Sequence, residues 1–86
     1  MAGHEKVLLK ILRGGSDANI HFDDLRALLR WLEFDERVGG SHHIFRKAGV
    51  EERINLQREG SHAKPYQVRQ VGGVILRYNL ARDVDA

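Results

Sequence analysis

The stretch FDERVGGSHHIFRKAGVEERINLQ, residues 34–57, decides the fold of this chain. Its three short runs, FDERV (34–38), HHIFRK (42–47) and ERINLQ (52–57), are rich in alternating or β-branched residues and are separated by GGS and KAGVE. Runs of this kind joined by glycine-containing turns are typical of neighbouring antiparallel strands. We therefore predict a three-stranded antiparallel meander, with the turn between its second and third strands near Ala48–Gly49.

Helical periodicity precedes this sheet. Residues 6–13 (KVLLKILR) place apolar side chains on one face, and the turn cluster GGSDAN follows them. Residues 22–33 (FDDLRALLRWLE) carry a clearer apolar stripe, with spacings of three and four. Asp23 is placed to cap the free amides of the first turn of this second helix. The sequence thus predicts two helices before the first strand.

A third helix is expected after the sheet. We predict a loop over residues 58–64, after which Pro65 suits the first turn of a helix because its missing amide costs nothing there. The helical period continues over residues 65–80. Gly72 and Gly73 lie in its middle, where each costs about 1 kcal/mol relative to alanine. The predicted order is α-α-β-β-β-α, an α+β two-layer fold with helices on one face of a small sheet.

Length and composition limit the classes of protein to consider. With 86 residues, residues 1–86 are expected to form a single domain with a modest core. The chain has no cysteine, which excludes disulfides and thiolate metal sites. The longest apolar stretch is broken by Lys10 and is too short for a membrane span or a signal peptide, so we expect a soluble cytoplasmic protein. The net charge is +2, but residues 61–82 hold basic residues and no acid, a distribution that suits a polyanion.

The adjacent histidines at positions 42 and 43 raise the question of chemistry. A strand would point His42 and His43 to opposite faces, His42 with Arg46 and His43 with Lys47, so the two cannot easily share one metal ion. The five histidines of the chain also lack the spacings usual for zinc ligands, and we expect no metal. One histidine should face the helices and the other the open side of the sheet. Alternation alone does not decide which, because both are followed by apolar residues.

A histidine can act alone as a general base or acid near neutral pH. RNA supplies its own nucleophile, the 2′-hydroxyl, so a minimal ribonuclease needs a base and cations for the phosphate. Arg46, Lys47 and the backbone amides of residues 39–41 could contact that phosphate. The competing interpretation is that one histidine is a hydrogen-bonded structural residue and the other is merely solvated.

Two motifs resemble the HicA family of bacterial toxins. GGSHHIF (39–45) leads into a strand, and KPYQVRQV (64–71) opens the last helix, as in the family's layout. The segment ANIHFDDLRALLRWLEF (18–34) is similar to a subgroup with an additional N-terminal helical segment. The resemblance divides the chain into an N-terminal helical extension, a core and a tail, at about residues 1–20, 21–80 and 81–86.

The resemblance implies a fold like the double-stranded RNA-binding domain and a toxin that cleaves mRNA without a metal or other cofactor, by a single histidine. It implies a HicB-like antitoxin as partner, and contact with DNA only indirectly, through the antitoxin complex. By position the catalytic residue would be His42, with His43 as the fallback. The expected RNA-binding residues, two of them from the cationic segment 61–82, are Gly40, Ser41, Arg46, Lys47, Lys64 and Arg69.

The chain departs from the family pattern at three places. Tyr66-Gln67 stands where Gly-Thr is common, and Gly72-Gly73 is unusual inside the last helix. Glu33 stands where glycine usually ends the second helix, which predicts about 1 kcal/mol of strain in a left-handed conformation. Two other classes of function stay open at this point: a non-catalytic RNA-binding module, and a protein-interaction domain that docks an antitoxin-like partner.

Overall fold

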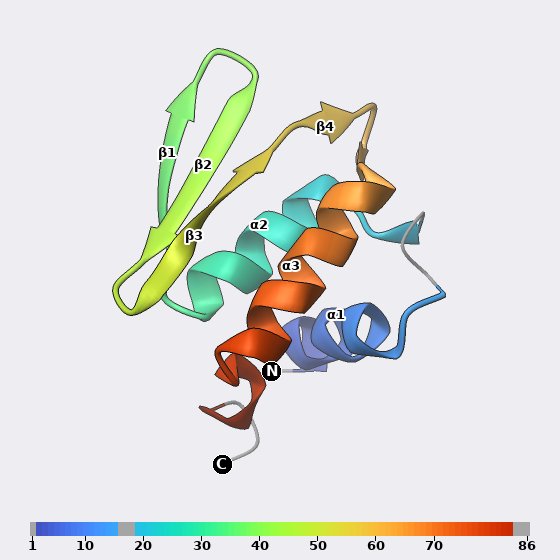
Figure 1. The fold of residues 1–86 in the computed structure, drawn as a ribbon. Coiled ribbons are helices and arrows are strands. Elements are labelled where there is room, and N and C mark those ends of the chain that lie inside the picture. Colours follow the sequence, from blue (N-terminus) through green and yellow to red (C-terminus); the bar gives the residue numbers. More distant parts are fainter. Residues whose placement is uncertain (1, 16–18, 84–86) are drawn as a thin grey trace.

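Helices lie on one side of a three-stranded antiparallel sheet in the computed structural model, which describes residues 2–15 and 19–83 (Figure 1). This is an α+β fold, as predicted. In chain order, the elements are α1 (Ala2–Arg13), α2 (Phe22–Trp31), β1 (Asp35–Gly39), β2 (His42–Lys47), β3 (Val50–Leu56), β4 (Arg58–Glu59), β5 (His62–Ala63), α3 (Pro65–Arg77) and the 3-10 helix η2 (Leu80–Asp83). No helix among the described residues is both long and apolar enough to cross a membrane.

The sheet has the order β1-β2-β3, with both neighbouring pairs antiparallel. In its register Gly39 lies opposite His42, and Ile44 lies opposite Asn55. The predicted turn between the second and third strands is confirmed at residues 48–49, where Gly49 has a φ of 87° that favours glycine. The register shifts between Phe45 and Lys47, and β3 begins at Val50, two residues earlier than expected.

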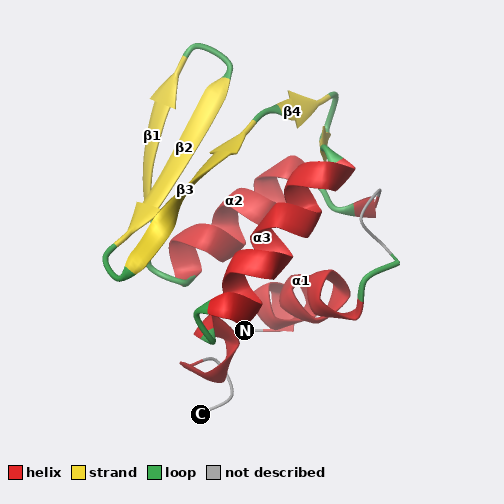
Figure 2. Cartoon of the chain, in the orientation of Figure 1, coloured by secondary structure: helices red, strands yellow, loops and turns green. Residues whose placement is uncertain are grey.

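The loop predicted for residues 58–64 is wrong, because this segment contains a second, two-stranded sheet of β4 and β5 (Figure 2). Gly60 turns the chain with a φ of 63°. The hairpin is tied to the chain before α2: the Ala63 amide donates to the Ile20 carbonyl at 2.9 Å, and the Phe22 amide donates to the Ser61 carbonyl at 3.0 Å. Strands of two residues carry no readable alternation, so the sequence pattern could not show them.

The predicted capping role of Asp23 is also wrong. His21 is the N-cap of α2 and makes no side-chain cap hydrogen bond. The Asp23 carboxylate instead accepts hydrogen bonds from Arg58 at 3.1 Å and from Arg26 at 3.4 Å. Asp23 therefore joins α2 to the β4–β5 hairpin, while its position in the first turn still suits the helix dipole.

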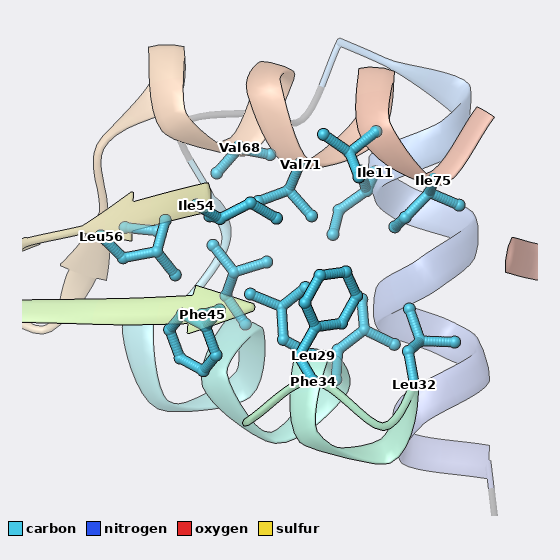
Figure 3. Close-up of a cluster of buried hydrophobic side chains, with 14 of the residues drawn as sticks. Ile11, Leu29, Leu32, Phe34, Phe45, Ile54, Leu56, Val68, Val71 and Ile75 are labelled. Carbon is cyan, nitrogen blue, oxygen red and sulfur yellow. The ribbon is translucent and has the colours of Figure 1, made fainter. Parts of the chain in front are cut away.

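The core lies between the sheet and the helices (Figure 3). Phe45 of β2 and Ile54 of β3 are fully buried and face α2 and α3. The N-terminal helix α1 contributes Leu8 and Ile11 to the same cluster, so the segment expected to be an extension shares one core with the rest. The other buried hydrophobic residues are Ile20, Phe22, Leu25, Leu28, Leu29, Leu32, Phe34, Leu56, Ala63, Val68, Val71, Val74, Ile75 and Leu80.

The two glycines of α3 have different surroundings. The helix continues through both without a break. A Cβ added to Gly72 would lie 3.1 Å from Cγ2 of Ile11, whereas one added to Gly73 would meet nothing within 4 Å. Gly72 thus allows α1 to approach α3 closely, and no packing contact requires Gly73.

Glu33 ends α2 in the left-handed conformation, as expected from its position. Its φ is 72°, and its amide donates to the Arg30 carbonyl at 2.9 Å. The next amide, of Phe34, donates to the Leu29 carbonyl at 3.0 Å. These two bonds satisfy carbonyls at the end of the helix and direct the chain into β1.

Candidate functional site

The two adjacent histidines lie on opposite faces of β2. Phe45 is fully buried against the helices, so by alternation His43 points toward the helix layer and is half-buried. His42 points to the open face and is exposed, together with Arg46 and the half-buried Ile44. The packing of Phe45 rather than Ile44 into the core answers the question that alternation left open.

His42 is the centre of a polar cluster formed by the ends of β2 and β3. Its Nδ1 lies 3.1 Å from Oδ1 of Asn55, a neighbour on β3. Its Nε2 lies 3.5 Å from Nε2 of Gln57, and the same amide nitrogen donates to Oγ of Ser41 at 3.4 Å. Asn55 and Gln57 are two residues apart, so the pleat brings both to the side of the sheet that carries His42.

These contacts define the tautomer of His42. An amide oxygen only accepts hydrogen bonds, so Nδ1 carries the proton that it donates to Asn55. The remaining nitrogen, Nε2, then has a free lone pair, which suits its approach to the amide nitrogen of Gln57, a donor. An exposed imidazole that is held at Nδ1 and only weakly contacted at Nε2 can accept a proton from a substrate hydroxyl.

Lys64 is the cation that belongs to this cluster. It is the N-cap residue of α3, and its Nζ donates to Oε1 of Gln57 at 3.4 Å. The backbone amide of Gln57 in turn donates to Oε1 of Gln67 at 3.0 Å. Gln67 is 4% exposed and lies in the first turn of α3. The buried amide of Gln67 therefore fixes the start of α3 against the end of β3, which places Lys64 next to Gln57 and thus near His42.

The surroundings of His43 are those of a structural residue. Its Nδ1 donates to Oε2 of Glu36 at 2.8 Å, and its ring meets Phe22 edge-on with a centroid distance of 5.0 Å. Glu36 also accepts two hydrogen bonds from Arg26, at 2.7 Å and 3.0 Å. The Arg26 guanidinium, followed by His43, lowers the pKa of Glu36 from 4.5 to about 2 despite its burial. Nδ1 of His43 and one edge of its ring are thus committed to the interior side of the sheet.

The structure brings some of the predicted RNA-binding residues to His42 and leaves others elsewhere. Gly40 forms the β1–β2 turn with a φ of 59°, directly beside Ser41. Arg46 shares the open face with His42. Lys47, on the other face, lies 3.9 Å from Glu33 in an ion pair. Arg69 lies on the second turn of α3 and borders a hollow between α3 and α1, away from the His42 cluster.

Three members of the cluster, Asn55, Gln57 and Gln67, were missed by sequence reasoning. All three carry side-chain amides, a residue type that does not by itself indicate a catalytic or binding site. Their juxtaposition depends on the β2–β3 register and on the path from β3 to α3. The spacing of two between Asn55 and Gln57 is the one signal available, and it indicates only a shared face.

Among the described residues, no three histidine or acidic side chains lie close enough together to hold a metal ion. Comparisons of the chain with protein-family models, with curated proteins and with solved structures give no match.

Proposed function

We propose that this protein is an endoribonuclease that cleaves mRNA with His42 as its catalytic histidine. The observation that carries the proposal is the exposed imidazole at the start of β2, whose Nδ1 donates to Asn55 and whose Nε2 has only the weak 3.5 Å contact with the Gln57 amide. The resemblance of GGSHHIF and KPYQVRQV to HicA toxins supports the same residue independently of this geometry.

The chemistry requires no group besides RNA and the chain. Nε2 of His42 accepts the proton of the 2′-hydroxyl, and the 2′-oxygen attacks the adjacent phosphorus. The bond from phosphorus to the 5′-oxygen of the next nucleotide breaks, which leaves a 2′,3′-cyclic phosphate and a 5′-hydroxyl after that oxygen takes up a proton. Lys64 would hold the phosphate oxygens as charge accumulates on them, and the Ser41 hydroxyl would donate a further hydrogen bond.

Gln57 holds this arrangement together before substrate enters. Its side-chain amide links Ser41, His42 and Lys64 through hydrogen bonds of 3.4 to 3.5 Å. Bonds of this length are weak, so a phosphodiester can displace them without a large penalty.

The biological setting that we propose follows from the HicA resemblance. The chain would be the toxin of a toxin–antitoxin pair, active on mRNA in the cytoplasm and neutralised by a HicB-like antitoxin. The helices on one side of a three-stranded antiparallel sheet are compatible with a fold like the double-stranded RNA-binding domain.

A non-catalytic RNA-binding module is the second candidate. It is favoured by the contacts of His42, because its described hydrogen-bond partners are the amides of Asn55 and Gln57 and none of them is an acid. For the ribonuclease, by contrast, the acid that protonates the leaving 5′-oxygen would have to be Lys64, the substrate or water.

The test compares His42→Ala with His43→Ala in an RNA cleavage assay that contains EDTA. We expect His42→Ala to lose cleavage by at least 100-fold, because a general base contributes about 10² to 10⁴ in rate. Asn55→Leu, which removes the acceptor for Nδ1, should lose less but shift the pH profile of kcat. In cells, expression should arrest growth and His42→Ala should relieve the arrest. Wild-type cleavage by both histidine variants, or RNA binding with no cleavage at all, would leave only the binding module.

A further inference from the structure

The open face of the sheet carries three arginines that have no partner. The side chains of Arg37 of β1, Arg46 of β2 and Arg53 of β3 are exposed and form no hydrogen bond or ion pair with any other described residue. Several arginines elsewhere are engaged: Arg26 and Arg58 bind Asp23, and Arg77 binds Glu52. By strand alternation these three guanidinium groups share the face opposite Phe45 and Ile54, and Figure 1 shows that no helix covers that side of the sheet.

The sheet register brings these arginines together. Arg37 lies opposite Ile44, and Arg46 is the next residue of β2 on the same face. Neighbouring strands are about 4.8 Å apart and residues on one face repeat about every 6.6 Å, so Arg46 starts within roughly 8 Å of each of the other two, and Arg37 and Arg53 start roughly 12 Å apart. Their side chains border a shallow hollow lined by Asp35, Glu36, Arg37, Ile44, Arg46 and Arg53.

The chemistry of this hollow favours a polyanion over a protein partner. Protein interfaces have an apolar centre, but the apolar side chain here is the single half-buried Ile44. Surfaces that bind nucleic acid are more polar and more positively charged. Of the two carboxylates at the hollow, that of Glu36 is engaged by Arg26 and His43, which leaves Asp35 as the one that would oppose an anion.

We propose that Arg37, Arg46 and Arg53 form a track for the phosphate backbone of single-stranded RNA, on the same face as His42. The inference rests on the proposed function and extends it to the substrate class. No phenylalanine, tyrosine or tryptophan of β1, β2 or β3 is exposed on this face, and the one exposed ring there is that of His42 itself. The contacts along the track would therefore be to phosphates and not to stacked bases. A duplex recognised by shape needs a surface that spans about 16 base pairs, which is far more than this hollow provides.

The test measures binding separately from cleavage. The probe is a short fluorescent single strand with 2′-O-methyl riboses, which lacks the nucleophile and cannot be cut by the proposed route. Anisotropy is recorded over a range of salt for the full chain, for Arg46→Gln/Arg53→Gln, and for Lys6→Gln/Arg13→Gln. The last variant removes the same charge from exposed positions on α1.

We expect Arg46→Gln/Arg53→Gln to weaken binding about tenfold at low salt. The slope of log K against log salt should become shallower by about 1.4, because each lost phosphate contact on a single strand removes about 0.7. The α1 variant should keep the wild-type slope. Asp35→Asn should tighten binding about two- to threefold, a gain that a purely structural arginine cluster would not produce.

Several outcomes would overturn the track. Equal losses in the two double variants would show that only net charge matters, and tighter binding of a duplex of equal length would exclude a single-strand site. Unchanged RNA affinity together with arginine-dependent binding of poly-L-glutamate would assign the face to an acidic protein. If His42→Ala still cleaves RNA while the arginine variants lose binding, the proposed catalytic function fails and the track stands.

Discussion

The two faces of the three-stranded sheet differ in whether their charged side chains are paired. On the helix side, Glu36 is 8% exposed in its side chain and is bonded to Arg26 and His43, so that each charge has a partner. On the open side, Arg46 and Arg53 are exposed and make no contact with another described charge. Glu36 and Arg37, adjacent residues of β1, thus have different roles. Paired charges next to the core stabilise the fold, and unpaired charges facing solvent remain available to a ligand.

Among the substitutions that distinguish the two faces, we expect the largest loss of folding stability at Glu36. The folded pKa of Glu36 is lowered from 4.5 to about 2, so its contribution is present above pH 4.5 and is lost as the pH falls toward 2. Glu36→Gln should therefore lower the free energy of unfolding by about 2 kcal/mol at pH 7 and by much less near pH 2. Urea unfolding at several pH values measures both. Glu59→Gln, at an exposed position of β4 with no partner among the described residues, is the control. Identical pH profiles for the two variants would contradict the role of Glu36.

His42 and His43 are adjacent in the sequence but lie on opposite faces of the sheet, so substituting each in turn compares how the two faces contribute to stability. His43→Ala removes the hydrogen bond to Glu36 and the edge contact with Phe22, and should cost about 1–2 kcal/mol of folding free energy. His42→Ala removes an exposed ring and should change stability by less than about 0.5 kcal/mol. Thermal or urea unfolding of both variants provides the comparison. A larger loss of stability for His42→Ala would show that the open face also supports the fold.

The smallest effect concerns a change distant from both faces. Gly73→Ala places a methyl group in open space within α3 and should raise the free energy of unfolding by about 1 kcal/mol, with RNA cleavage unaltered. Gly72→Ala gains the same helix propensity but presses on Ile11, so its stability should fall below that of Gly73→Ala. Unfolding and cleavage assays on the same variants would show whether stability changes while RNA cleavage stays the same. Equal stabilisation by both alanines would mean that α1 moves freely away from α3.

The strands and the turn at residues 48–49 could be predicted because a period of two and a glycine are local signals. The direction of the histidines could not, because Ile44 and Phe45 are both apolar, and only the space left by the helices selects the larger ring for the core. The β4–β5 hairpin escaped prediction for another local reason, since two residues are too few to establish a period.

In the candidate site, too, some features follow from local sequence and others depend on the whole fold. The motif residues Ser41 and His42 could be named from the sequence, and Lys64 could be placed at the start of a helix. Their connection through Gln57 depends on where β3 ends and where α3 begins, which are set by the packing of the whole domain. The arginine track likewise requires the strand register, because Arg37, Arg46 and Arg53 lie on three different strands.

The hydrogen bond from the Gln57 amide to Gln67 has a consequence for observing the molecule in solution. Gln57 lies just outside β3, yet its amide is held by the side chain of a residue that is 4% exposed. Exchange of that amide with deuterium therefore requires α3 to separate from the end of β3, and its rate reports how often the His42 cluster comes apart. Deuterium exchange at this one backbone amide can thus report whether the His42 cluster is assembled, without any label attached to the histidine itself.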